Sequence, residues 1–301
     1  MNNETLIEKY LSSKTNDNTK KSYGHDLKLF SEFINKNLME IDMFDAIDYF
    51  NSIDNKSPAT FNRRLLSVRD FYNFYIEAEY YHKNNPTNRV KRKKLDYEGK
   101  TKPLQVDQTV KLIKLIKNKI KIYTKNNDKF NRNLQLRNLS LIMCDVNGGF
   151  RASELLELTF DRLDIENCRI ELLATDTKGK DKRIVNFDSN VMGYLNDYLE
   201  IRGDFLKGKE SEYVFVSKSG LPLGYSDYLK IVKAYGKEID IENLTTHDLR
   251  STYIVNVYKA TGNDLVKTQK IINHKSLAQT RRYTNIEIDE TELIKLPTAR
   301  L

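Results

Sequence analysis

Five side chains in the second half of the sequence are of types suited to phosphoryl transfer: Arg151, His247, Arg250, His274 and Tyr283. A guanidinium stays protonated and donates in a planar fork, which suits it to phosphate oxygens. A tyrosine, with a pKa of about 10, becomes a nucleophile when a base or nearby cations help to remove its proton. With a lysine as the acid for the leaving oxygen, such a set could bind a phosphodiester and attack it.

The sequence offers little for a metal or a nucleotide cofactor. None of the four histidines, which include His25 and His82, stands at a metal-ligand spacing, and no group of aspartates resembles a two-metal centre. Gly148-Gly149 is too short for a glycine-rich phosphate loop. We therefore expect no metal and no cofactor. Arginines and imidazole N–H groups would then oppose the negative charge of the transition state.

The composition bounds the class of protein. The 301 residues are enough for two domains, and the net charge of +8 favours a polyanionic partner, although lysine-rich chains also occur without one. No apolar run is long enough to span a membrane, and the N-terminus lacks the order of a signal peptide. Cys144 and Cys168 belong to no motif and are expected to be reduced, as in a cytoplasmic protein.

Hydrophobic periodicity predicts how these residues are positioned. Residues 1–81 are expected to form a small helical bundle, in which Ser57-Pro58 begins one helix and apolar residues recur at helical spacing. Residues 82–103, with five cations in residues 89–94, are expected to be a basic interdomain linker, either a solvated spacer or a strap along phosphates.

The second predicted domain spans residues 104–301. It is expected to be largely helical, with a helix over 134–146 that ends in a left-handed turn at Gly148-Gly149. Two short strands, 170–174 and 183–187, would form a hairpin whose tip contains Lys178 and Lys180, and a further short strand is expected over 213–216.

The order and spacing of three motifs are the most specific features of this sequence. Residues 149–155 read GFRASEL, residues 246–250 read THDLR, and His274 precedes Tyr283 by nine positions. The second domain thereby resembles the catalytic domain of the tyrosine recombinases, the phage integrase and Xer/Cre superfamily. The resemblance implies a mainly α fold with a small antiparallel β-sheet: an N-terminal helical, SAM-like core-binding domain and a C-terminal mixed α/β catalytic domain.

The resemblance also implies a role for each motif residue. Tyr283 would attack the scissile phosphate and form a 3′-phosphotyrosyl bond, which stores the bond energy so that no ATP is needed. Arg151, Arg250 and His274 would bind the non-bridging oxygens. His247 would assist proton transfer at the tyrosine.

Two further groups complete the set that the resemblance implies. Lys178, or Lys180 if the hairpin register shifts, would protonate the leaving 5′-oxygen, and Glu154 would orient the other groups. Asn273 replaces a common glycine, and Ser251 stands where histidine or arginine is common; we expect little effect from either departure.

Double-stranded DNA with inverted-repeat core sites is the partner that the resemblance implies, held between the two domains. Its candidate contacts, which could equally be solvated cations, are Lys20, Lys21, Arg63, Arg64, Arg92 and Lys93.

The apolar tail after Tyr283 would dock on a neighbouring protomer to give a homotetramer, or fold back on its own domain. Accessory proteins are possible partners, and a chain that begins with the core-binding bundle favours a simple recombinase.

Two other functions share parts of this pattern. A type IB topoisomerase uses the same tyrosine chemistry without exchange of partners, and it would relax supercoils without recombinant products. A DNA-binding or architectural module with a decayed site would bind DNA without a covalent adduct.

Overall fold

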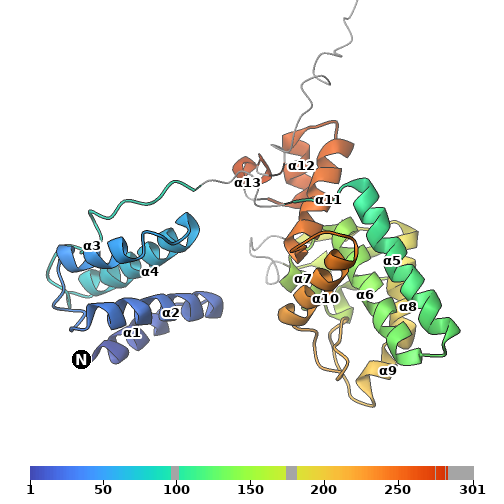
Figure 1. Ribbon diagram of the computed structural model, residues 1–301, viewed down its shortest axis with the longest axis horizontal. Coiled ribbons are helices and arrows are strands. Elements are labelled where there is room, and N and C mark those ends of the chain that lie inside the picture. The colour runs from blue at the N-terminus through green and yellow to red at the C-terminus, as the bar shows by residue number, and fades with distance from the viewer. Residues whose placement is uncertain (96–101, 174–181, 275, 282, 284–301) are drawn as a thin grey trace, which may run out of the picture. The chain divides into compact units, whose positions relative to one another are not determined.

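The chain forms two compact units, residues 1–97 and 98–301, in the computed structural model (Figure 1). The structure describes residues 1–95, 102–173, 182–274, 276–281 and 283. Each unit is described by itself. The predicted hairpin tip with Lys178 and Lys180, and the predicted tail after Tyr283, lie outside the described residues.

The first unit is a bundle of four helices. They are α1 (Asn3–Ser12), α2 (Asp17–Ile34), α3 (Met43–Ser52) and α4 (Pro58–Glu77). A polar side chain at each N-cap accepts a hydrogen bond from a backbone N–H of the first turn, and Pro58 occupies the first helical position of α4, as the sequence predicted.

Aromatic residues fill the core of this bundle, and three of them also form hydrogen bonds to the backbone of other segments. The predicted apolar stripe of α4 is buried from Phe61 to Tyr75. Three buried tyrosines donate their hydroxyls to backbone carbonyls: Tyr72 to Leu38, Tyr75 to Leu6 and Tyr81 to Ile41. Each bond satisfies a polar group that burial would otherwise leave unpaired.

Much of the segment that we expected to be linker packs against the first unit. Arg69 of α4 donates hydrogen bonds to the backbone carbonyls of Thr87 and Val90, and Asn62 exchanges two bonds with the backbone of Lys93. The segment lacks an apolar period and is held mainly by polar contacts of this kind, which hydrophobic patterning could not predict.

The second unit contains nine helices among its described residues. They are α5 (Val106–Lys125), α6 (Lys129–Gly148), α7 (Ala152–Leu156), α8 (Ser189–Ile201), α9 (Gly203–Leu206), α10 (Tyr225–Glu238), α11 (Thr246–Ala260), α12 (Leu265–Ile272) and α13 (Leu277–Arg281). Helix α6 is buried on most of its surface because α5, α8 and α11 all pack against it (Figure 1).

A small antiparallel sheet of three strands, in the order β1-β2-β3, completes this unit among the described residues. The strands are β1 (Leu163–Asp164), β2 (Arg169–Leu172) and β3 (Arg183–Asn186), and a single 3₁₀ turn, Phe160–Arg162, leads into β1. The predicted pair β2 and β3 is confirmed, with Ile170 opposite Val185. The strand expected over 213–216 is absent: this segment makes only two isolated bridges, from Tyr213 and from Val216.

Candidate active site

Five residues from three motifs line one cavity of about 470 Å³ in the second unit: Arg151, His247, Arg250, His274 and Tyr283. Arg151 is the N-cap of α7, and both His247 and Arg250 lie in the first turns of α11. His274 follows α12 directly, and Tyr283 follows α13. Tertiary packing thus brings together all five residues that the sequence selected for phosphoryl transfer.

The turn between α6 and α7 aims the first arginine. Gly149 ends α6 in the left-handed conformation with φ 58°, as predicted, and its N–H donates to the carbonyl of Asp145 at 2.8 Å. A Cβ on Gly149 would overlap the ring of Tyr253, so both its backbone angle and the close packing require glycine. The carbonyl of Gly149 accepts a hydrogen bond from Arg250, which joins this turn to α11.

The carboxylate of Glu154 lies beneath the arginines and is almost fully buried, with a side-chain exposure of 1%. It accepts hydrogen bonds from both the backbone N–H and the guanidinium of Arg151. One of its oxygens lies 3.5 Å from the guanidinium of Arg183 and 3.9 Å from that of Arg250. A single negative charge therefore faces three positive ones, and the excess positive charge suits an anion.

Arg183, the first residue of β3, is a part of the site that the sequence analysis missed. It is buried, its guanidinium lies over the ring of Phe150, and it donates to the carbonyl of Ile272 at 3.4 Å. Arg183 thus contacts both Glu154 and the end of the helix that precedes His274. The sequence did contain a signal for Arg183. Alternate residues of a short strand are buried, and an arginine on the buried face needs a partner for its charge.

Arg250 and His274 contact each other. Nη2 of Arg250 lies 3.3 Å from Nε2 of His274, and Nδ1 of His274 lies 3.1 Å from the hydroxyl of Thr280. A guanidinium can only donate, so Nε2 accepts and the proton of the neutral ring is on Nδ1. Burial and then Arg151 lower the pKa of Arg250 to about 10, which leaves it charged at neutral pH.

The backbone before His274 has the conformation that its sequence allows. Asn273 ends α12 in the left-handed region, with φ 52° and ψ 52°, where glycine is common in the family pattern. Asparagine tolerates this region better than most residues. The departure at this position therefore leaves the local turn intact.

His247 faces the tyrosine. Its Nε2 lies 3.4 Å from the hydroxyl of Tyr283, and the two rings are nearly parallel. Burial and then Arg250 lower the pKa of His247, which favours the neutral imidazole. A neutral imidazole with a free nitrogen lone pair can accept the proton of a tyrosine.

The candidate DNA contacts of the first unit differ in their surroundings. Arg63 bonds to the fully buried carboxylate of Asp26, and Nε of Arg64 lies 3.8 Å from the same group. The side chain of Arg64 is only 14% exposed, so its main contacts are inside the bundle. Burial raises the pKa of Asp26 although Arg63 opposes this shift.

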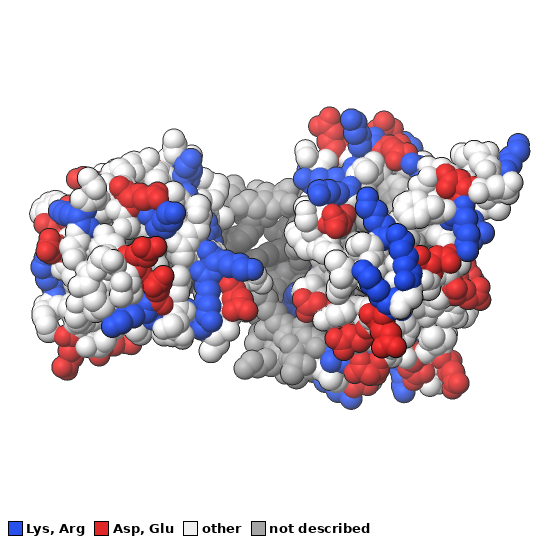
Figure 2. Space-filling model, turned by 90° about the horizontal axis from the view of Figure 1, so that it is seen from below, with Lys and Arg blue, Asp and Glu red and all other residues white. Residues whose placement is uncertain are grey.

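Among the other candidates, Lys93 pairs with Asp54 at 2.7 Å and lies over the ring of Phe61. Lys21 and Arg92 are exposed, and Lys20 lies 3.7 Å from Asp17. On the face seen in Figure 2, basic and acidic side chains are intermixed on both units. Of the six candidates for DNA contact, Lys21 and Arg92 are the most accessible.

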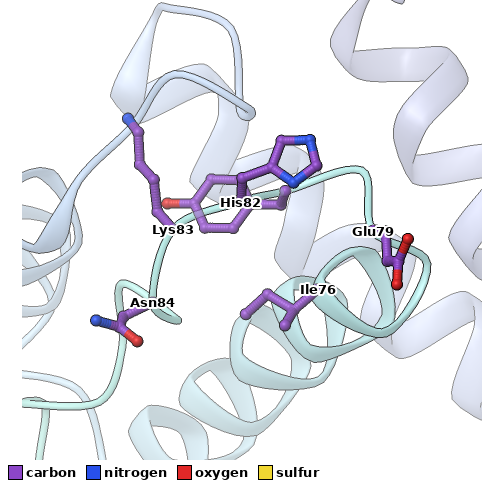
Figure 3. A pocket seen from close by; sticks show the side chains of 6 residues that line it. Ile76, Glu79, His82, Lys83 and Asn84 are labelled. Carbon is purple, nitrogen blue, oxygen red and sulfur yellow. The ribbon is translucent and has the colours of Figure 1, made fainter.

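A second hollow lies at the end of α4 (Figure 3). Two of its polar groups have structural partners: Lys83 donates to the backbone carbonyl of Glu40 at 2.9 Å, and the hydroxyl of Tyr81 donates to the backbone carbonyl of Ile41. These bonds hold the segment after α4 against the bundle. We assign no chemistry to this hollow.

The described residues contain neither a cluster of metal ligands nor a membrane-spanning helix. No group of three or more His, Cys, Asp or Glu side chains in these ranges could hold a metal ion. None of the helices in the described ranges combines the length and the apolar character of a membrane span.

Comparison with known proteins agrees with the geometry. A tyrosine beside a histidine, in a pocket with two arginines, is an arrangement suited to forming a covalent bond to a phosphoryl group. The phage integrase family matches residues 102–290, and the N-terminal SAM-like domain of phage integrases matches residues 7–79. The chain therefore belongs to the phage integrase family and is a tyrosine recombinase with the mainly α, two-domain fold predicted from its sequence.

Relatives match this chain along almost all of its length. Tyrosine recombinase XerD of Staphylococcus epidermidis is 26% identical over 296 residues, which cover 94% of each chain. Tyrosine recombinase XerD of Staphylococcus aureus is 28% identical over 300 residues, again covering 94% of each.

Solved structures share the fold. A XerH site-specific recombinase bound to its difH substrate has a TM-score of 0.71 at 17% identity, over 97% of this chain and 93% of that one. The Tn1549 transposon integrase bound to transposon right-end DNA has a TM-score of 0.69 at 18% identity, over 98% of each chain.

Proposed function

We propose that this chain cleaves and rejoins double-stranded DNA at specific sites, with Tyr283 as the nucleophile. The observation that carries the proposal is the contact of 3.4 Å between the hydroxyl of Tyr283 and Nε2 of His247, inside a cavity that Arg151 and Arg250 also line. As the hydroxyl oxygen bonds to phosphorus, its proton passes to His247. The match to XerD recombinases along 94% of the chain disfavours both the topoisomerase and the decayed-module alternatives.

Arg151 and Arg250 are proposed to bind the non-bridging oxygens of the scissile phosphate. Both guanidiniums face the cavity, and the buried carboxylate of Glu154 holds them without cancelling their combined charge. Charge that is already in position requires no reorganisation as the transition state forms. His274 would join them as an imidazolium that has taken up a second proton at Nε2, once the phosphate replaces the contact between Arg250 and that nitrogen.

The general acid for the leaving 5′-oxygen is proposed to be Lys178, with Lys180 as the alternative. Both follow β2 and precede β3, whose first residue, Arg183, reaches Glu154 in the site. The strand that follows these lysines in the sequence thus begins at the site. The broken P–O5′ bond leaves a 5′-hydroxyl, and a 5′-hydroxyl from a second duplex reverses the step and exchanges the strands.

Strand exchange between two sites requires several protomers. We propose that four copies assemble on two DNA sites with inverted-repeat cores, joined by exchange of the residues after Tyr283. The DNA complexes of XerH and of the Tn1549 integrase, which share this fold, support DNA as the partner. Accessory proteins would set the direction of the reaction.

Covalent trapping on a nicked suicide duplex tests the proposal. The duplex would carry a site recovered by binding selection, and adducts would be resolved on a denaturing gel. We expect an adduct with the unaltered protein and none with Tyr283→Phe, whereas Tyr80→Phe, which changes an exposed tyrosine of the first unit, should form it normally. An adduct that persists in Tyr283→Phe refutes the nucleophile. DNA binding without an adduct from any variant refutes the reaction.

A further inference from the structure

Ser251 is a fully buried residue of α11, one turn after His247, and it contacts that histidine twice. Its hydroxyl donates to the backbone carbonyl of His247 at 2.7 Å, and the same oxygen lies 3.3 Å from Nδ1 of the ring. The sequence analysis treated this serine as a departure of little effect.

The two contacts decide where the ring proton is. A serine hydroxyl has one proton, and the carbonyl of His247 already accepts it. The contact with Nδ1 must therefore be a bond that the ring donates and the serine oxygen accepts. A neutral imidazole with its proton on Nδ1 has its lone pair on Nε2, the atom that faces Tyr283 at 3.4 Å.

We propose that Ser251 is a positioning residue that holds His247 in the Nδ1–H tautomer, so that Nε2 can accept the proton of Tyr283. The proposal deepens the proposed function and rests on it for its consequence in catalysis, but the tautomer itself can be measured without DNA. During attack, the proton of the tyrosine hydroxyl passes to Nε2 as the oxygen–phosphorus bond forms. The resulting imidazolium still donates from Nδ1 to Ser251, which stabilises its charge.

The groups around His247 are compatible with a neutral ring. Arg250 and Asp248 lie on the same helix, Tyr283 faces it from after α13, and Arg151 and His274 line the same cavity. Tyr225 of α10 also lines this cavity. Arginines dominate this set, and a positive surrounding disfavours a second proton on the ring.

Nitrogen NMR of protein labelled in its histidines tests the tautomer directly, because the chain has only four. The signals of His247 are assigned by their loss in His247→Ala. We expect the unaltered protein to have a protonated Nδ1 and an unprotonated Nε2 at neutral pH. In Ser251→Ala the ring loses its acceptor, and the Nε2–H form should become populated. A protonated Nε2 in the unaltered protein, or an unchanged pattern in Ser251→Ala, overturns the proposal.

Trapping rates then test the consequence. Ser251→Ala should slow adduct formation by about 10- to 100-fold, the range typical when a partner that orients a metal-binding histidine is lost. It should have no further effect in a His247→Ala background, because the serine acts through that ring. Ser140→Ala removes an equally buried hydroxyl from α6 and should leave the rate unchanged. Equal slowing in both backgrounds would make Ser251 merely structural, while absence of adducts from the unaltered protein would refute the proposed function and not the tautomer.

Discussion

The guanidinium of Arg183 lies 3.5 Å from the carboxylate of Glu154, and both side chains are almost completely buried. One residue begins the strand that follows the expected hairpin lysines, and the other belongs to the first arginine motif. Arg183 also donates to the end of α12, next to His274. This pair therefore connects three segments that carry separate parts of the proposed chemistry.

Replacing Arg183 by lysine should keep the charge but lose the fork that contacts Glu154 and Ile272 together. We expect adduct formation at saturating DNA to slow by about tenfold, since partners of this kind hold functional groups in place. Arg169→Lys changes an exposed arginine of β2 that pairs with Asp164, and it should behave like the unaltered protein. Equal rates for both variants would show that the connection is dispensable.

Glu154→Gln should destabilise the second unit and impair cleavage. Loss of the carboxylate leaves three close guanidiniums without a counter-charge, and breaking a buried ion pair costs about 3 kcal/mol. Denaturant unfolding would measure this loss, and trapping would measure activity. Glu157→Gln, an exposed change just after the same helix, is the control and should have little effect on either.

Gly149→Ala should destabilise the turn that aims Arg151. The new Cβ would overlap Tyr253 at a backbone angle that disfavours side chains, with a cost of about 1–3 kcal/mol. Gly193→Ala is the matched control. Gly193 lies in the interior of α8, where a new Cβ would meet no neighbouring atom, and alanine is the better helix former, so this change should stabilise the second unit by about 1 kcal/mol. Changes of the same sign in the two unfolding curves would contradict this.

Asp145 should give the second unit a distinct pH dependence. Burial raises its pKa to about 7, and the hydroxyl of Tyr228 donates to it at 2.8 Å. Between its unfolded pKa of about 4 and pH 7, the folded state binds more protons than the unfolded state, so this residue's contribution to stability falls as pH rises.

Asp145→Asn should remove this slope, which is about 1.4 kcal/mol per pH unit for one proton. Unfolding free energies of both proteins between pH 4 and 7 would test it, and their difference should change steadily in favour of the asparagine variant. A constant difference across this range would mean that Asp145 titrates alike in the folded and unfolded states.

Arg92→Ala should weaken DNA binding through lost phosphate contact. Binding should become less dependent on salt, with the slope of log affinity against log salt reduced by about one. Arg64→Ala should instead destabilise the first unit, because it removes a partner of buried Asp26. An unchanged slope for Arg92→Ala would place that residue away from the DNA.

Local patterns in the sequence determined a large part of this protein. Helical spacing of apolar residues predicted the stripe of α4, Gly149 predicted the left-handed end of α6, and two short runs on either side of a turn-like segment predicted β2 and β3. The order of the arginine, histidine and tyrosine motifs indicated the family, because each residue type has a chemistry that few others supply. These features depend on neighbours within a few positions, which a single sequence displays.

Only the tertiary structure decided which groups share a charge or a proton. Glu154 faces three arginines from three elements, Arg64 turns inward to Asp26, and the segment after α4 packs on its own unit. Ser251 contacts His247, one helical turn before it, and His247 in turn faces Tyr283 from a distant segment. The proposed role of Ser251 depends on both contacts. Such relationships depend on distances across the fold, because hydrogen bonds and ion pairs act over a few ångströms whatever the separation along the chain.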